Sequence, residues 1–418
     1  MKRMWTPLFL LLTSLPAFAT SVPWAPLSAD DFLPVDPARV ELGRQLFKDP
    51  VLSGNFNISC QTCHLPEFGS ADGVSLSVGE GGIGEGPKRT ANAGIKKRVP
   101  RHAPPLWNLG HRSVTQMFWD GRLSIDPKAP SGFDSPAEDR LPQGLNSLLA
   151  AQAVLPLTAQ FEMAGNTGEN EVIGAARQRI DWAWPVIVER IIGFDYYWEL
   201  LQAAYPELTR RRDVDISHLA NAIGDFINLE FRTLDAPIDR IARGQAVQLS
   251  DSEQRGLALF YQDGSCAQCH SGPLMTNQSF VSLGLPPMGP GRTRPWDPVA
   301  RDLGRMAHSN DWNDRYAFRV PSLRNVGKTA PYGHNGAYAT LRGIIEHHND
   351  PRAALDRYDR SQAILADAAH LERIDWIGFE NAREMARLRD SIQVEPMGLS
   401  AQDIDDLIAF LGLLDSED

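Results

Sequence analysis

The sequence is poor in cysteine, in positive charge, in strand-forming runs and in long apolar stretches beyond its N-terminus. Only four cysteines occur in 418 residues, and two short motifs use all of them. The formal net charge of -11 at pH 7 argues against nucleic acid as a partner and favours a donor or substrate that presents basic groups. Because strand signals are sparse, we expect a mainly α protein, and the length allows two or three domains.

The four cysteines form one motif, CxxCH, that occurs twice. This spacing is the attachment signature of c-type haem: two thiols bond to the vinyl groups of one porphyrin, and the histidine becomes the proximal ligand of its iron. A CxxC pair also occurs in disulfides, redox pairs and zinc sites, but none of these requires a histidine directly after both pairs. The sequence therefore predicts two covalently bound c-type haems. The residues that would hold them are Cys60, Cys63, His64, Cys266, Cys269 and His270.

The N-terminus has the order of a secretory signal. Met1-Lys2-Arg3 is basic, an apolar run follows over 5–18, and small residues lead to Ala19, after which we expect cleavage. An uncleaved anchor is the alternative, but Pro7 and Pro16 interrupt a run that is already short for a membrane span. We therefore expect a periplasmic protein without a membrane span after cleavage, which agrees with the assembly of c-type haem outside the cytoplasm.

An internal repeat divides the chain. Gly43-Arg44-Gln45-Leu46-Phe47 and Gly256-Leu257-Ala258-Leu259-Phe260 both have the pattern GxxLF ahead of a haem motif, which indicates two related domains. We expect a signal peptide over 1–19, an N-terminal haem domain over 20–247 and a C-terminal haem domain over 248–418. Apolar spacing predicts helices over 38–47, 145–155, 171–180, 182–192, 216–234, 341–348 and 401–414, a helix start at Ser250, and loops over 69–101, 123–144 and 285–315.

Beyond the haem motifs, an ordered set of short stretches resembles one family, the bacterial dihaem cytochrome c peroxidases and the related MauG enzymes. These stretches are Phe118-Trp119-Asp120-Gly121-Arg122, Glu162-Met163, Val320-Pro321-Ser322-Leu323-Arg324-Asn325-Val326 and Thr329-Ala330-Pro331-Tyr332-Gly333-His334-Asn335-Gly336, followed by Thr340-Leu341. The resemblance covers nearly all of the mature chain. It implies two cytochrome c-like helical domains with one haem each, a calcium ion between them, an N-terminal haem that meets peroxide and a C-terminal haem that relays electrons.

The resemblance also implies roles for three side chains. Glu162 lies ten residues after Gln152, which is the family's spacing for a distal glutamate and a hydrogen-bonding glutamine. Glu162 would then move the proton that cleavage of peroxide requires. Trp119 matches the family's tryptophan between the two haems, where an indole can mediate electron transfer. Without the resemblance, Glu162 would be taken for an exposed charge at a helix end and Trp119 for a core aromatic.

Two positions depart from the family. Typical peroxidases supply a second histidine to the first iron from the loop after CxxCH, but no His or Met occurs from 65 to 101, so we expect this iron to be open. His102 and His111 are the nearest alternatives, and the motif around His102 indicates a structural role. By resemblance, the sixth ligand of the second iron is His348, at a position where the peroxidases have Met and MauG has Tyr. A haem with two histidine ligands would have a lower reduction potential than a His/Met haem. The neighbouring His347 fits a surface position better.

The expected calcium site has less support from the sequence than the haem sites have. By resemblance, the carbonyls of Thr329 and Pro331 bind it, but the usual asparagine after an arginine is His102 here, which leaves a site of carbonyls and water. Three further residues are expected to form ion pairs, contacts with haem propionates or structural contacts near the second haem: Arg122, Arg324 and His334.

Three functions follow, in order of expectation. The first is a periplasmic peroxidase that reduces hydrogen peroxide with electrons from a small cytochrome c or a copper protein. The second is a MauG-like enzyme that uses peroxide to oxidise a residue, such as tryptophan, on a partner protein; both departures favour it over a peroxidase gated by reduction. The third is a dihaem electron carrier without catalysis, which would need two saturated irons. The resemblance adds a homodimer as an expected assembly.

Overall fold

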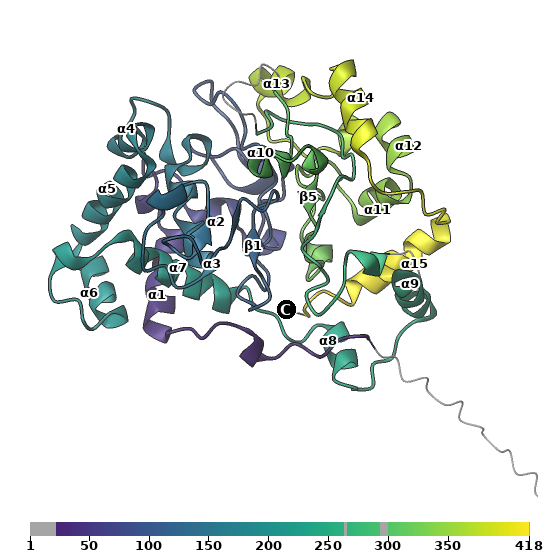
Figure 1. Cartoon of the computed structure of the whole chain (residues 1–418), viewed down its shortest axis with the longest axis horizontal. Helices are drawn as coiled ribbons and strands as arrows, with labels where there is room; N and C mark the ends of the chain where they lie inside the picture. The colour runs from purple at the N-terminus through teal and green to yellow at the C-terminus, as the bar shows by residue number, and fades with distance from the viewer. Residues whose placement is uncertain (1–21, 263–265, 293–299, 418) are drawn as a thin grey trace, which may run out of the picture.

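A computed structural model describes residues 22–262, 266–292 and 300–417, and the expected signal peptide lies outside them. Figure 1 shows two halves side by side, the N-terminal half in purple to teal and the C-terminal half in green to yellow. Both are mainly helical, which confirms the predicted fold class. Within the described residues, no helix is long and apolar enough to cross a membrane.

The N-terminal half is built around one apolar core, in which α1 packs against α7. Helix α1 begins where the sequence predicts because the Asp36 carboxylate accepts hydrogen bonds from the backbone N–H groups of Ala38 and Arg39. The helices of this half are α1 (Pro37–Lys48), α2 (Cys60–Cys63), α3 (Leu148–Ala153), α4 (Glu171–Gln178), α5 (Ile180–Ile192), α6 (Asp195–Ala204) and α7 (Ile216–Glu230).

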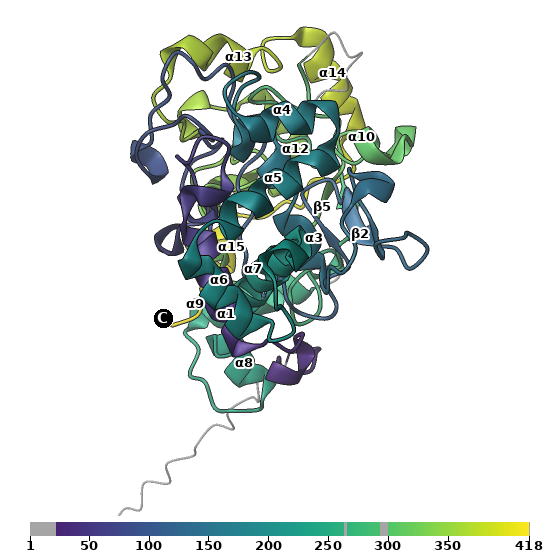
Figure 2. The ribbon, with the colours of Figure 1, turned by 90° about the vertical axis from the view of Figure 1, so that its left-hand side faces the viewer.

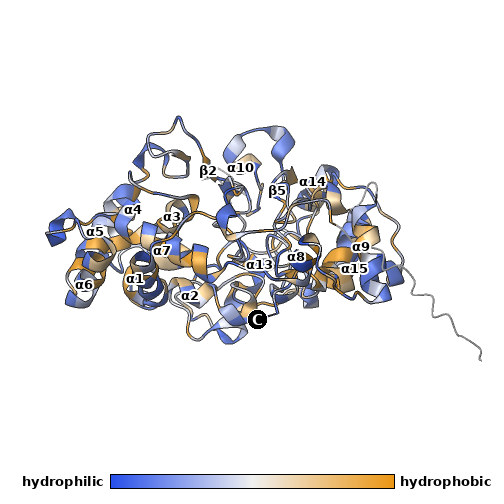
Figure 3. Cartoon of the chain, turned by 90° about the horizontal axis from the view of Figure 1, so that it is seen from below, coloured by the Kyte–Doolittle hydropathy of each residue, from blue (hydrophilic) through white to orange (hydrophobic). Residues whose placement is uncertain are grey.

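The C-terminal half has its own apolar core around α9 and α15. Viewed from below and coloured by hydropathy, the ribbon is hydrophobic where α9 and α15 meet (Figure 3). Two views at right angles place α13 and α14 at the end of the molecule opposite α8 (Figures 1 and 2). The helices here are α8 (Pro237–Ala242), α9 (Asp251–Tyr261), α10 (Met306–Ser309), α11 (Leu341–Asn349), α12 (Pro351–Asp356), α13 (Glu372–Trp376), α14 (Ala382–Ser391) and α15 (Ala401–Gly412).

The internal repeat is confirmed by packing. A Cβ atom on Gly43 would lie 1.9 Å from the carbonyl oxygen of Ala222 in α7, and a Cβ on Gly256 would lie 1.9 Å from that of Asp406 in α15. Only glycine allows two helices to approach this closely. The phenylalanine four residues later packs on a phenylalanine of the partner helix in both halves, with ring centroids 5.1 Å apart for Phe47–Phe226 and 4.8 Å for Phe260–Phe410.

Short strands lie near the boundary between the halves. Strands β1 (Gln116–Met117), β2 (Leu123–Ile125) and β3 (Phe133–Asp134) form an antiparallel sheet in that order, with Met117 opposite Leu123 and Ser124 opposite Asp134. In the other half, β4 (Phe280–Val281) pairs antiparallel with β5 (Phe318–Arg319). The backbone N–H of Arg319 donates to the carbonyl of Trp119 over 2.7 Å, so β5 is joined to the N-terminal half.

Several helices are absent from the prediction. Helices α6, α12, α13 and α14 were not expected, and the predicted excursion over 123–144 opens with the β2–β3 hairpin. Helix α14 shows why: among its ten residues only Glu384, Leu388 and Ser391 are buried, so it has no continuous apolar stripe to reveal a helical period.

The predicted loop over 69–101 contains no long element, but its first part is not solvated. Every residue from 69 to 80 is buried. The backbone N–H of Ser75 donates to the carbonyl of Ile364 over 2.7 Å, and the Arg98 guanidinium pairs with Asp375 over 3.0 Å in a nearly solvent-free setting. The loop is therefore held between the N-terminal core and the C-terminal segment over 363–376.

Candidate active site

The second haem motif opens onto a large cavity. This cavity of about 880 Å³ lies in the C-terminal half and reaches the boundary with the N-terminal half. Cys266, Cys269 and His270 line it, and His348 enters from α11. Much of the remaining wall is apolar and includes Leu283, Leu341, Ile344, Leu407 and Leu411. An apolar cavity with two thiols and two imidazoles suits a covalently held macrocycle.

The three predicted iron ligands share one hydrogen-bonding pattern. Nδ1 of His64 lies 2.8 Å from the carbonyl of Ser70, Nδ1 of His270 lies 3.1 Å from that of Met275, and Nδ1 of His348 lies 2.8 Å from that of Ile344. A carbonyl can only accept, so Nδ1 carries the proton and donates in each case. Nε2 then keeps its lone pair, which is the arrangement that a metal-binding imidazole needs. These residues fit haem iron.

Protonation favours ligation in the same way. Burial, with a smaller contribution from the neighbouring His348, lowers the pKa of His270 to about 4. Burial also lowers the pKa of His348. Both imidazoles are therefore neutral at physiological pH, and both residues line the same cavity.

The first haem motif forms a single helical turn, α2, in the N-terminal half. The Phe47 ring of the GxxLF repeat lies 6.4 Å from the His64 ring, between centroids, and so packs the proximal side. Burial raises the pKa of the Cys60 thiol to about 12 and that of the Cys63 thiol to about 12. For Cys63 the nearby carboxylates of Asp72 and Glu162 add to the rise, which places Glu162 within electrostatic reach of the attachment cysteine.

Glu162 lies on a five-residue π turn, η7 (Gln160–Ala164), rather than at a helix end. Neighbouring segments fix this turn: the backbone N–H of Glu80 donates to the Glu162 carbonyl over 3.0 Å, and that of Gly54 donates to the Met163 carbonyl over 2.7 Å. Burial raises the pKa of the Glu162 carboxyl, and the nearby Arg122 and Arg292 oppose the rise. A half-buried carboxyl with a raised pKa close to two cations can both accept and return a proton.

Gln152 lies in the last turn of α3 and is half-buried. The following 3₁₀ turn, η6 (Pro156–Thr158), packs on η7, so the chain brings Gln152 and Glu162 into the same region. No hydrogen bond joins their side chains in the described part of the chain. The pairing of these two residues remains a prediction.

Trp119 lies at the boundary between the two halves. It is 8% exposed, it lines the cavity of the second haem motif, and its indole N–H donates to the carbonyl of His102 over 2.9 Å. His102 is in turn close to the first motif: burial lowers the pKa of His64, and the nearby His102 contributes to this lowering. The indole therefore lies beside the cavity of the second haem motif and is bonded to a residue near the first motif.

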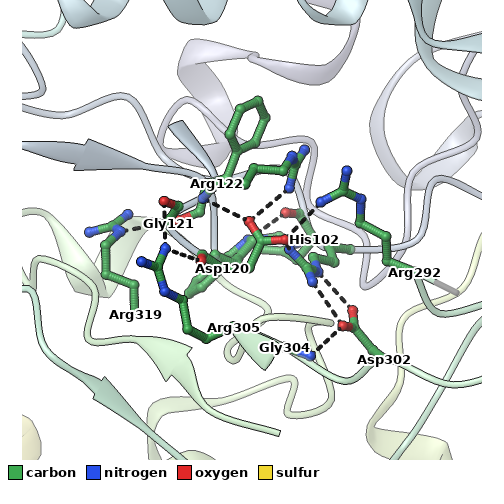
Figure 4. A network of polar contacts seen from close by, with 12 residues as sticks. His102, Asp120, Gly121, Arg122, Arg292, Asp302, Gly304, Arg305 and Arg319 are labelled. Carbon is green, nitrogen blue, oxygen red and sulfur yellow. Dashed lines mark hydrogen bonds and ion pairs between the residues drawn. The ribbon is translucent and has the colours of Figure 1, made fainter. Parts of the chain in front are cut away.

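An arginine cluster surrounds Asp120, directly after Trp119 (Figure 4). Asp120 is fully buried and pairs with Arg101 at 2.8 Å, with Arg122 at 3.0 Å and with Arg292 at 2.9 Å. Burial alone would raise the pKa of Asp120, but the three guanidinium groups hold it well below its usual range. The cluster also contains Arg305, Arg319 and Asp302. Its arginines outnumber its carboxylates, an excess that suits the carboxylates of haem propionates.

Sequence reasoning did not identify this cluster. Asp120 belongs to a quoted motif, yet nothing in the local sequence links it to Arg101 or Arg292. Of the two arginines expected to be structural, Arg122 pairs with Asp120 and Arg324 forms a fully buried pair with Asp239 at 2.7 Å. Both are ion pairs, as expected.

The expected surface position of His347 is wrong. Its side chain is fully buried, with Nδ1 2.7 Å from the Tyr338 hydroxyl and Nε2 2.9 Å from the Leu283 carbonyl. Successive helical residues point about 100° apart, so His348 can face the cavity while His347 faces the protein core. His334, expected near the second haem, lines the cavity with its ring stacked on Phe318 at a centroid distance of 3.5 Å.

A calcium site made of the carbonyls of Thr329 and Pro331 and of water remains a prediction. Thr329 and Pro331 both line the cavity, but the third position is His102, whose Nδ1 lies 2.9 Å from the Val74 carbonyl. Calcium takes six to eight oxygen ligands, often carboxylates, and an imidazole nitrogen is a poor substitute. Within the described residues, no group of three or more His, Cys, Asp or Glu could hold a metal ion.

Each helical half contains a CxxCH histidine in the protonation state and tautomer that bind iron. Two such halves define a protein of the di-haem cytochrome type. The di-haem cytochrome c peroxidase family model matches residues 37–247. The chain belongs to this family and is a haem-dependent oxidoreductase with two haems.

Named relatives include both activities of the family. The chain is 30% identical over 320 residues to methylamine utilization protein MauG of Methylorubrum extorquens, covering 75% of this chain and 69% of that one. It is 28% identical over 313 residues to cytochrome c551 peroxidase of Pseudomonas aeruginosa, covering 75% and 72%. Among solved structures, a MauG-like protein associated with microbial copper homeostasis matches with a TM-score of 0.59 at 25% identity, covering 97% of this chain and 95% of that chain.

Proposed function

We propose that this protein is a periplasmic peroxidase that reduces hydrogen peroxide with electrons from a small cytochrome c or a copper protein, without prior reduction of either haem. One observation carries the proposal: the segment after the first CxxCH motif offers the iron no displaceable ligand. It contains no His or Met from 65 to 101, and its part over 69–80 is buried, with the backbone N–H of Glu80 bonded to the Glu162 carbonyl.

The residues of the two predicted haem sites then have separate roles. Haem, when bound, supplies the iron that meets peroxide and the redox centre that receives electrons. His64 would hold the first group, and Glu162 would move a proton between the two peroxide oxygens, with Gln152 as a hydrogen-bonding partner. His270 and His348 would hold the second group. Trp119 lies between the sites and carries electrons toward the first.

A MauG-like reaction is the second candidate: peroxide would drive oxidation of a residue, such as tryptophan, on a partner protein. The same lack of a displaceable ligand favours it, because a site that is open at rest needs no activating electron from a donor. The similarity to MauG and to the copper-associated MauG-like structure supports it. In this case the acidic chain would meet a partner with basic groups.

Three further features are proposed on the sequence evidence: a signal peptide cleaved after Ala19, a boundary between the haem domains near 248, and a homodimer. The two apolar cores divide near residue 235, so α8 packs with the C-terminal core although it precedes that boundary.

Mixing the fully ferric protein with one equivalent of peroxide in a rapid-mixing spectrometer tests the proposal. We expect prompt loss of the ferric haem bands because the first site is already open. If the protein is a peroxidase, added small cytochrome should then restore the bands. Slow restoration by electron donors together with fast restoration by a partner protein would indicate the MauG-like reaction. No reaction until one haem has been reduced would contradict the open-site proposal.

Replacing His348 by alanine should convert the second haem from low spin to high spin, because the imidazole that fills its sixth position is removed. Electron paramagnetic resonance of the ferric protein measures this change, with the high-spin signal of the first haem as an internal reference. The matched control is His370→Ala: its Nε2 lies 2.9 Å from the Ile95 carbonyl, in another part of the structure. An unchanged low-spin signal in the His348 variant would refute the assignment.

A further inference from the structure

A tyrosine and a histidine form a buried pair beside the cavity of the second haem motif. The Tyr338 hydroxyl lies 2.7 Å from Nδ1 of His347. Tyr338 is 3% exposed and His347 is fully buried, so the hydrogen bond is shielded from water. The predicted iron ligands and the Glu162 site leave this pair without a role.

The direction of the hydrogen bond follows from the other side of the ring. Nε2 of His347 lies 2.9 Å from the Leu283 carbonyl, which can only accept. Nε2 therefore carries the proton, and Nδ1 presents a lone pair to Tyr338. The phenol donates to an imidazole nitrogen, a group that can take the proton completely.

The position of the pair links it to the second haem site. His347 is the chain neighbour of His348 in α11, and Leu283, to which His347 is bonded, lines the cavity. The backbone of Tyr338 pairs with that of Tyr332, another residue of the cavity wall. Only the helix backbone and one hydrogen bond separate the Tyr338 phenol from His348.

Two neighbouring tyrosines, Tyr332 and Tyr358, lack a comparable acceptor. The Tyr332 hydroxyl donates to the Val326 carbonyl over 3.0 Å, and the Tyr358 hydroxyl donates to the Ala337 carbonyl over 2.6 Å. The ring of Tyr358 lies 5.5 Å from that of Tyr338, between centroids. A carbonyl does not take up a phenolic proton, so these two phenols could be oxidised only by forming an unfavourable cation radical.

We infer that Tyr338 is a redox-active residue that donates one electron to the oxidised protein after reaction with hydrogen peroxide. The phenolic O–H bond breaks, an N–H bond forms at Nδ1 of His347, and the electron reduces the oxidised centre by one equivalent. Tyr338 becomes a neutral tyrosyl radical hydrogen-bonded to an imidazolium. Peroxide supplies the oxidising equivalent, so the inference rests on the proposed reaction with peroxide.

Freeze-quench electron paramagnetic resonance of the haem-loaded protein after one equivalent of peroxide, without an electron donor, tests this inference. We expect a tyrosyl radical that narrows when the tyrosines are ring-deuterated. Tyr338→Phe should abolish it and prolong the oxidised haem spectrum, since an electron source has been removed. Tyr358→Phe, an equally conservative change in the adjoining ring, should leave it in place.

The other outcomes are distinct. Loss of the ferric bands without a tyrosyl signal, or a signal that survives Tyr338→Phe, would overturn this inference and leave the peroxide reaction standing. A signal abolished by Tyr316→Phe instead would overturn it in favour of the Tyr316 phenol, which donates to the Glu384 carboxylate over 2.7 Å. Absence of any reaction with peroxide would overturn the proposed function itself.

Discussion

Replacement of Glu162 by glutamine is expected to slow the reaction of the ferric protein with peroxide by about 10²–10⁴-fold, the usual contribution of a general acid–base group. Glutamine preserves the shape of the side chain and the π turn around it but cannot accept a proton. The rate constant for loss of the ferric bands measures the effect directly. Haem content and the resting spectrum should stay unchanged.

The pH dependence gives a second measure of Glu162. Burial raises the pKa of its carboxyl, and only the deprotonated form can take the peroxide proton. The wild-type rate should therefore rise as pH rises through this pKa, and the E162Q variant should lose that rise. Glu189→Gln, at an exposed position of α5, is the control and should match the wild type. An E162Q variant with the wild-type rate would remove Glu162 from the mechanism.

Replacement of Asp120 by asparagine is expected to lower the free energy of unfolding by about 3–5 kcal/mol, as breaking a buried ion pair usually does. Asparagine is nearly the same size, so packing around the residue is kept. What is lost is the negative charge at the centre of three guanidinium groups, none of which can lose its proton. Denaturant unfolding of the haem-loaded variant, followed by circular dichroism, provides the measurement.

Controls separate this effect from a general loss of charge. Asp213→Asn removes a carboxylate from the exposed pair with Arg210 and should leave unfolding unchanged. The pKa of Asp120 is held well below its usual range, so its stabilisation is fully present above the pKa of an unfolded aspartate and is lost only in strong acid. The difference between wild type and D120N should therefore persist from neutral to mildly acidic pH. Equal stability of the two proteins would show that the cluster does not stabilise the fold.

Local signals made much of the fold predictable. Helix α1 was expected from its apolar spacing and α9 from the start signal at Ser250, and both have a capping residue in the structure. The CxxCH motifs specify their chemistry through three residues in fixed order. The shared tautomer of His64, His270 and His348 could not be predicted, because the accepting carbonyls are set by the fold.

Features that depend on contacts between residues distant in the sequence could not be predicted from local sequence patterns. His347 was placed at the surface because adjacent histidines carry no sign of which one a helix turns inward. The partners of Asp120 come from Arg101 and Arg292, and only the packed halves bring them together. The glycine-rich segment over 69–101 resembles a solvated loop because its burial comes from the C-terminal half and not from its own apolar period.

The contact between that segment and residues 363–376 has a consequence for the order of assembly. Ser75 and Ile364 are 289 residues apart, and Arg98 and Asp375 are 277 apart. Because a chain is synthesised N-terminus first, the first CxxCH motif is complete long before the walls beside it can close. The porphyrin can therefore be installed in an accessible, unfinished site, and docking of the last part of the chain seals it afterwards.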